Sequence, residues 1–394
     1  MSTAERHELE RRLELALHGS ERGRTIIARS ADGRRAYAAV RAAHPEREVF
    51  RVGCTAKLFV AALVERTLDA HGIGYDVPVR HVLGGSSGAA LGDTSLRHLL
   101  EHTHGLDDAA APETAFRGDG SIDVERLLER VSGRRIAAPG ALYSYSHVGA
   151  LIAAALVETL EQRPFEALLR DELLAPLGVE LRRCRTPETF AICPASGGAL
   201  GLTIDGLLTF VESHRPQVDH AMMPLPGWHP LERGVRLGWK CYAGSWVGHQ
   251  SAWPGASLLV CSRPRDRAAL VVASEDHHAA VVAARALGDE MPELFVPRLP
   301  KQRAGAPGLD PAPYLGRYAS AGDAVGIEAD ADGLVLAGDR GRVRLLPAAD
   351  EIFFLERSTR ARAFVQFIVR RRGRFLALWD GQRVLPRAGS PPLG

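Results

Sequence analysis

The sequence predicts an α+β domain over residues 1–296, followed by a small antiparallel β-barrel over residues 314–394. Short strand-like runs occur near residues 25–40 and return near 234–274. Helical patterns dominate between about 54 and 180. Strands at both ends with helices between them predict one antiparallel sheet that joins the two ends of the domain and is flanked by helices.

The elements of the first domain follow in order. The first helix is predicted from Ala4 to Leu17, and two strands, TIIARS and RAYAAV, follow with the turn signal Asp32-Gly33 between them. The central helices are predicted in TAKLFVAALVERTLDAHG, SLRHLLEH, DVERLLERV and HVGALIAAALVETLEQ. The later strands are predicted in GVRLGWKCY, SWVGHQ, ASLLVCS and AALVVAS, and HHAAVVAARALGDEM is predicted as the closing helix.

Residues 297–313 contain five prolines, and we interpret them as a linker. Beyond them the pattern changes to seven or eight short alternating runs separated by Asp-Gly, Gly-Asp or Arg-Gly turns. Short runs at this spacing predict the β-barrel of residues 314–394.

Composition excludes several classes of protein. The chain is 46% hydrophobic and 24% charged, which is typical of a globular protein and excludes a disordered one. Its net charge of +2 gives no indication of nucleic-acid binding. The five cysteines are odd in number and irregularly spaced, so no disulfide framework is expected. The N-terminus lacks the apolar core of a signal peptide and no long apolar stretch follows, so we expect a cytoplasmic protein without a membrane segment.

Cys54 and Lys57 form the most informative pair in the chain. Cys54 follows Gly53 and is predicted to open a helix, and the spacing i, i+3 puts the thiol and the amine on one helix face. A thiol at a helix N-terminus beside an ammonium group has a depressed pKa, which favours the nucleophilic thiolate. Only three of the 49 basic residues are lysines, which makes Lys57 more informative. Taken alone, this spacing is a weak signal and favours the simpler interpretation, a buried structural cysteine and an exposed lysine.

The surroundings of this pair extend the pattern. Apart from Cys for Ser, FRVGCTAKLFVAALVERTLDAHGIGYDVPVRHVL resembles the S-x-x-K region of serine β-lactamases and penicillin-binding proteins, in particular the class C, esterase and transacylase branch. The segments TSLRHLLEHTHGLDD, ALYSYSHVGALIAAALVE and VGHQSAWPGASLLVCSRP resemble later motifs of that family, in the same order, over roughly residues 20–290. The C-terminal unit resembles the lipocalin-like domain that often follows it. The resemblance implies a β-lactamase/transpeptidase-like fold with an all-helical subdomain.

The resemblance also implies roles for individual residues. Cys54 takes the place of the acylated serine, Lys57 that of the lysine that holds or moves the proton, and Tyr145 that of the general acid/base. His147 stands where an asparagine orients the lysine and the substrate amide, and His249 stands at the Lys or His of the third motif. The backbone N–H groups of Cys54 and Ala252 would form the oxyanion hole. Candidate substrate-binding residues are Gln250, Ser251, Ala252, Trp228 and Trp253.

Four departures from the family pattern affect the expected activity: Cys54 for Ser, His147 for Asn, Ser251 for Gly and His104 for Ser. Ser251 adds bulk beside the acyl pocket, which suggests a substrate other than a β-lactam. A thioester is more receptive to amines than an oxygen ester is, so we expect an acyltransferase that forms an amide or ester through a Cys54 acyl-enzyme in natural-product biosynthesis. The expected donor is a small-molecule or carrier-bound acyl group, and the expected acceptor is an amine. Two alternatives remain open: a carboxylesterase or peptidase that uses water as acceptor, and a catalytically silent ligand-binding protein.

Other clusters have simpler interpretations. Four of the five tryptophans, Trp228, Trp239, Trp246 and Trp253, fall near the third motif and are either core residues or the lining of an apolar acyl pocket. The histidines at 98, 102 and 104 match a structural stretch of the family, so we expect no metal and no cofactor. The arginines of the barrel are either a solvated strand face or a docking surface for an acidic carrier protein; they lie at positions 357, 360, 362, 370, 371, 372 and 374.

Overall fold

The computed structural model describes most of the 394 residues. The described ranges are 3–17, 23–107, 116–117, 121–131, 135–184, 198–214, 234–253, 255–275, 279–295, 309–320, 323–339, 341–349, 351–356, 364–380 and 383–393. The predicted linker lies outside them except for residues 309–313.

The first domain is built on a seven-stranded antiparallel sheet whose strands run in the order β2-β1-β10-β9-β8-β7-β6. Strands from both ends of the domain meet where β1 pairs with β10, which confirms the prediction that one sheet joins the two ends. The strands are β1 (Thr25–Ala31), β2 (Arg34–Val40), β6 (Gly234–Arg236), β7 (Trp239–Cys241), β8 (Val247–Trp253), β9 (Ala256–Arg263) and β10 (Ala268–Ser274). A second, three-stranded sheet contains β3 (Val49–Arg51), β5 (Leu200–Thr203) and β4 (Arg182–Arg183).

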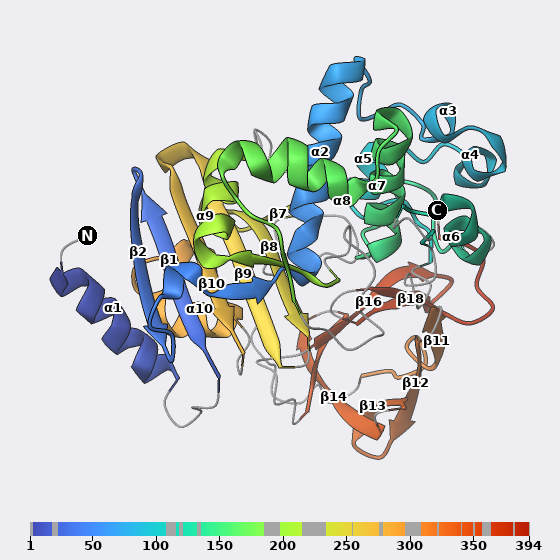
Figure 1. The fold of residues 1–394 in the computed structure, drawn as a ribbon. Helices are drawn as coiled ribbons and strands as arrows, with labels where there is room; N and C mark the ends of the chain where they lie inside the picture. Colours follow the sequence, from blue (N-terminus) through green and yellow to red (C-terminus); the bar gives the residue numbers. More distant parts are fainter. Residues whose placement is uncertain are drawn as a thin grey trace.

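Helices cover both faces of the large sheet, as Figure 1 shows. On one face α1 (Thr3–Ala16) and α10 (Ala279–Leu287) bury apolar side chains such as Leu13 and Val282 against the strands. On the other face α2 (Ala56–His71) and α9 (Ile204–Ser213) pack into the main core. The remaining helices are α3 (Arg80–Leu83), α4 (Gly85–Leu91), α5 (Leu96–Leu100), α6 (Val124–Val131), α7 (His147–Glu161), α8 (Phe165–Leu168) and α11 (Pro292–Phe295).

The helices α2 and α7 form the centre of the helical part of the domain. Helix α2 buries 11 of its 16 residues and α7 buries 10 of its 15, as expected of helices packed into a large core. Helix α2 ends at Gly72, whose φ of 64° is the left-handed conformation that commonly closes a helix. These two helices carry the first and second motifs, so their packing fixes how the two motifs face each other.

The C-terminal unit is an eight-stranded antiparallel sheet in the order β11 to β18, and it is nearly closed into a barrel, as predicted. A bridge between Tyr318 and Arg387 brings its first and last strands together. The strands are β11 (Gly316–Ser320), β12 (Asp323–Asp330), β13 (Gly333–Gly338), β14 (Gly341–Ala349), β15 (Ile352–Leu355), β16 (Phe364–Arg371), β17 (Arg374–Trp379) and β18 (Val384–Pro386). In Figure 1 the barrel lies beneath the helical part of the first domain.

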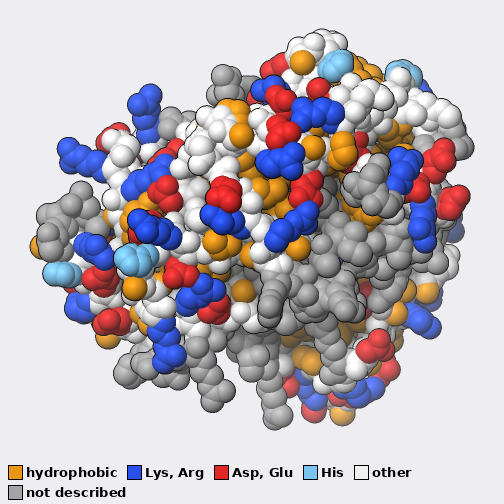
Figure 2. Space-filling view, in the orientation of Figure 1, with side chains coloured by type: hydrophobic (Ala, Val, Ile, Leu, Met, Phe, Trp, Pro, Cys, Tyr) orange, Lys and Arg blue, Asp and Glu red, His pale blue; other side chains and the backbone are white. Residues whose placement is uncertain are grey.

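The surface carries charges of both signs. Figure 2 shows basic and acidic side chains interspersed over this face, in keeping with the small net charge of +2. Within the described residues, every helix falls short of the length and apolar character that a bilayer crossing requires.

Candidate functional site

Cys54 lies between the end of β3 and the start of α2. A 3₁₀ turn, Gly53–Thr55, leads directly into the helix, so the thiol sits just ahead of α2 instead of within its first turn. The Thr55 hydroxyl donates a 2.5 Å hydrogen bond to the Val52 carbonyl and holds this turn in place. The cysteine is half-buried and packs against Tyr143, Tyr145 and Val235.

Lys57 projects from the first turn of α2 toward the second motif and is only 2% exposed. Its Nζ lies 3.2 Å from Nδ1 of His147. An ammonium group only donates hydrogen bonds, so Nδ1 of His147 is the acceptor. The same Nζ lies 4.8 Å from the centre of the Tyr145 ring, within the range of a cation–π interaction. A buried cation therefore links the first motif to both functional side chains of the second.

The thiol of Cys54 is strongly acidic. Burial by itself raises its pKa, but the positive charge of Lys57, the electrostatic effect of the nearby His147 ring and hydrogen bonds from the side chains of His147 and Tyr145 outweigh burial. Together they lower the pKa from its ordinary value of 9.0 to about 5. A pKa this low favours the thiolate form of Cys54 at neutral pH.

The second motif reaches the site through the start of α7. Ser146 caps this helix, since its hydroxyl accepts the N–H of Gly149 at 3.3 Å. The cap places His147 at the first helical position and Tyr145 just before it, with their ring centres 5.6 Å apart. Tyr145 is 8% exposed and His147 is half-buried. The structure therefore brings Cys54, Lys57, Tyr145 and His147 together as predicted.

The third motif lies on β8, beside Cys54. His249 and Ser251 are two residues apart on a strand, so both side chains point to the same face of the sheet, and they are 1% and 2% exposed. Nδ1 of His249 lies 2.7 Å from the Gln250 carbonyl, which only accepts, so Nδ1 carries the proton and Nε2 a lone pair. Nε2 has no hydrogen-bond partner among the described residues. Burial, and then the charges of Lys240 and Lys57, hold the pKa of His249 well below its ordinary value.

Ser251 contacts Cys54 directly. The backbone N–H of Cys54 donates a 2.7 Å hydrogen bond to Oγ of Ser251. The expected oxyanion hole uses this same N–H together with that of Ala252, so one of its two donors is already engaged by Ser251. Gln250 and Ala252 alternate with Ser251 along β8 and are half-buried and exposed, respectively.

Two residues at the site had no role in the sequence interpretation. Nζ of Lys240, on β7, lies 5.2 Å from the centre of the Tyr145 ring. Two ammonium groups therefore lie near this ring, one from α2 and one from β7. His102 lies 4.7 Å from the same ring, and its Nδ1 accepts the N–H of Ser146 at 3.3 Å. Burial, and then the charge of Lys57, keep the pKa of His102 well below its ordinary value. The scarcity of lysine was the one sequence signal that pointed to Lys240.

The structure assigns other positions to two tryptophans and one histidine that the sequence had singled out. Trp239 stacks on Phe210, and Trp246 is fully buried between the sheet and the helices α1 and α10, so both belong to the core. Trp228 and the side chain of Trp253 lie outside the described residues. His104 accepts the N–H of Leu106. Within the described part of the chain, no three His, Cys, Asp or Glu side chains are grouped as metal ligands.

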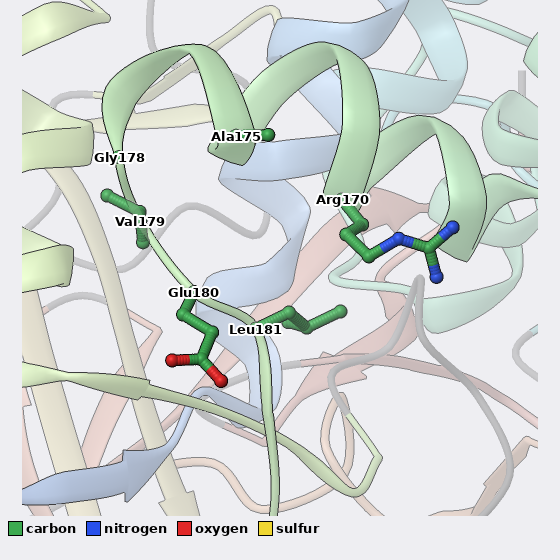
Figure 3. A pocket seen from close by; sticks show the side chains of 6 residues that line it. All are labelled: Arg170, Ala175, Gly178, Val179, Glu180 and Leu181. Carbon is green, nitrogen blue, oxygen red and sulfur yellow. The ribbon is translucent and has the colours of Figure 1, made fainter.

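A shallow surface depression of about 410 Å³ lies elsewhere on the domain, in the segment that follows α8 (Figure 3). It contains none of the candidate site residues and offers no nucleophile, so we assign it no role in the chemistry. Its lining residues are Arg170, Ala175, Gly178, Val179, Glu180 and Leu181.

Several known proteins resemble this chain in sequence or in fold. A curated relative, penicillin-binding protein 4 of Amycolatopsis lactamdurans, is 29% identical over 159 residues; the match spans 39% of this chain and only 41% of the relative. The structure of SurE with D-Leu superposes with a TM-score of 0.78 at 21% identity, covering 98% of this chain and 100% of SurE. The D-amino acid amidase of Ochrobactrum anthropi SV3 with L-phenylalanine gives a TM-score of 0.58 at 16% identity, covering 71% and 96%. The Beta-lactamase family model matches residues 2–290, and this chain therefore belongs to the beta-lactamase family.

Proposed function

We propose that this protein is an acyltransferase that forms an amide or ester through a thioester between the acyl group and Cys54. The observation that carries the proposal is the side-chain cluster at the nucleophile position: Cys54 packs against Tyr145, and Nζ of the buried Lys57 lies beside both the Tyr145 ring and Nδ1 of His147. The lowered pKa of Cys54 supports it. A half-buried thiolate beside a proton-carrying network is the arrangement that covalent acyl transfer requires. In this proposal the chain belongs to the class C, esterase and transacylase branch, and its barrel is a lipocalin-like domain.

The first half-reaction acylates the enzyme. The Cys54 thiolate attacks the carbonyl carbon of an ester or thioester donor, and the bond to the leaving oxygen or sulfur breaks. Tyr145 gives its phenolic proton to the leaving group and becomes a phenolate, which the ammonium groups of Lys57 and Lys240 stabilise at short range. Because the Lys57 ammonium donates to His147, the lysine is held in one position during this step.

The second half-reaction transfers the acyl group to an amine. The amine nitrogen attacks the thioester carbon, the carbon–sulfur bond breaks, and the Cys54 thiolate is restored. The Tyr145 phenolate takes the proton that the amine loses. Thioesters react more readily with amines than oxygen esters do, so a cysteine nucleophile favours transfer over hydrolysis.

We propose a small-molecule or carrier-bound acyl donor for the first half-reaction. If the donor is bound to a carrier protein, we propose that the carrier is acidic and docks on the arginines of the barrel. Arg371, Arg372 and Arg374 are exposed where β16 turns into β17, which leaves them accessible to such a partner. The barrel arginines at positions 357, 360 and 362 lie outside the described residues.

Intact-mass analysis tests the proposal. The protein is incubated with ester and thioester donors that carry D- or L-aminoacyl groups, because structures with this fold are named for D-Leu and D-amino acid chemistry. We expect an adduct of the acyl mass that is absent in Cys54→Ala, and an amide product when an amine is added. Absence of any Cys54-dependent adduct overturns the covalent mechanism. Release of the free acid at the same rate with and without amines identifies a hydrolase instead.

A further inference from the structure

Ser251 and Cys54 are joined across two separate elements of the fold. The N–H of Cys54, in the 3₁₀ turn before α2, donates a 2.7 Å hydrogen bond to Oγ of Ser251, on β8. Ser251 pairs with Leu258 on β9, and this pairing fixes the position of the serine in the large sheet. Ser251 is 2% exposed, so its hydroxyl lies in the protein interior and not in bulk solvent.

This hydrogen bond determines which group can donate to the carbonyl oxygen of the acyl group. The oxygen of a carbonyl attacked by Cys54 becomes negatively charged and requires donors at hydrogen-bond distance, about 2.7–3.1 Å. The backbone N–H of the nucleophile points at the Ser251 oxygen instead. Two oxygens cannot occupy the same position, so an acyl oxygen reaches this N–H only after the serine side chain rotates away.

The serine hydroxyl itself retains a donor. A hydroxyl group has one proton to donate besides its two acceptor lone pairs, and accepting the Cys54 N–H uses only a lone pair. The bond to Cys54 is the one hydrogen bond of this side chain among the described residues. Buried donors are normally satisfied, and a hydroxyl that accepts a hydrogen bond becomes a stronger donor. A buried, polarised O–H beside the nucleophile therefore suits an acceptor that arrives with the substrate.

We propose that the Ser251 hydroxyl donates the hydrogen bond that stabilises the acyl oxygen, and that the Cys54 N–H acts through it. The inference rests on the proposed acylation of Cys54. As the carbon–sulfur bond forms, the π electron pair of the carbonyl moves to oxygen, and the Ser251 O–H donates to this oxygen without losing its proton. The pair returns as the bond to the leaving group breaks. Ser251 is thus a catalytic residue of the oxyanion site, and the bulk that it adds is functional.

The test compares two reactions of the same thiol in Ser251→Ala, Ser251→Gly and Ser251→Thr. Acylation by a thioester develops an oxyanion, whereas alkylation by iodoacetamide displaces iodide and develops none. Each rate is measured by intact mass on the full chain, and thermal unfolding confirms that each variant is folded. The alkylation rate reports whether Cys54 remains positioned and ionised after the substitution.

We expect Ser251→Ala and Ser251→Gly to slow acylation by at least about tenfold, toward the 10²–10³-fold typical of a lost oxyanion donor. Their alkylation rates should stay close to that of the wild type, and Ser251→Thr, which keeps a hydroxyl, should retain more acylation than either. Unchanged or faster acylation in the Ala and Gly variants overturns the inference, and faster acylation identifies Ser251 as a group that the substrate must displace. If the wild type alkylates but is acylated by no donor, the proposed function fails, and this inference fails with it.

Discussion

The backbone N–H of Val384, in the last strand of the barrel, donates a 3.1 Å hydrogen bond to the hydroxyl of Ser144, the residue before Tyr145. Residues after the last strand of the barrel also form hydrogen bonds with the segment that precedes Ser144. The N–H of Leu393 donates to the Ile136 carbonyl at 2.7 Å, and the N–H of Ala138 donates to the Leu393 carbonyl at 2.9 Å. The barrel and the residues after it therefore contact the backbone that brings the second motif to Cys54.

This contact predicts that Ser144→Ala affects both stability and chemistry. The substitution leaves the buried Val384 N–H without its acceptor, which costs about 1–3 kcal/mol of unfolding free energy. We also expect slower acylation of Cys54, because Tyr145 is the next residue. Urea denaturation and intact-mass acylation rates measure the two effects. The matched control is Ser213→Ala on the exposed side of α9, where a change within about 0.5 kcal/mol is expected. Wild-type values of both quantities in Ser144→Ala would show that the barrel contact does not position Tyr145.

The acidity of Cys54 predicts a distinctive alkylation profile. Because the pKa is lowered to about 5, the rate of alkylation by iodoacetamide should rise through about pH 5 and level off well below neutral pH. Burial raises the pKa values of Cys184 and Cys261, so these two thiols serve as internal controls that stay unreacted in the same range. Peptide mapping after labelling assigns the modified residue. A Cys54 rate that continues to rise toward pH 9, the ordinary value for a thiol, would contradict the thiolate assignment.

Lys57→Met tests the source of this acidity. The lysine charge is the leading influence that lowers the pKa of Cys54, and methionine keeps a similar length without the charge. The midpoint of the alkylation profile should move to higher pH. His147→Asn removes the hydrogen bond that the imidazole gives to the thiolate, and we expect a shift in the same direction. A profile that does not move in Lys57→Met would mean that another group holds the thiolate.

The sequence predicted the architecture and the central cluster because both depend on local patterns. Short apolar runs predicted the strands β1 and β10, and the Cys54–Lys57 spacing predicted that the thiol and the amine belong to one site. The family resemblance then supplied the order in which Tyr145, His147 and His249 reach the same thiol.

The remaining parts of the site depend on long-range packing that no local pattern encodes. Lys240 approaches Tyr145 because β7 pairs with β8 beside the third motif, and His102 approaches it from the end of α5. The hydrogen bond between Cys54 and Ser251 depends on how the large sheet lies against α2. Spacing along the sequence does not indicate how elements so far apart pack against each other. These contacts could therefore be identified only from the structure.

The packing of α7 predicts that Gly149→Ala damages both the fold and the site. A Cβ at this position would lie 2.7 Å from the Leu99 carbonyl oxygen and 2.9 Å from the His104 ring. Neither neighbour lies at the end of a flexible chain, so α7 must shift, at a cost of about 1–3 kcal/mol. His147 is two residues away, so the shift should lengthen its contact with Lys57 and raise the pH midpoint of Cys54 alkylation. Gly74→Ala is the matched control, because nothing lies within 4 Å of its Cβ. Equal unfolding free energies for the two variants would show that α7 and α5 accommodate the methyl group without moving the site.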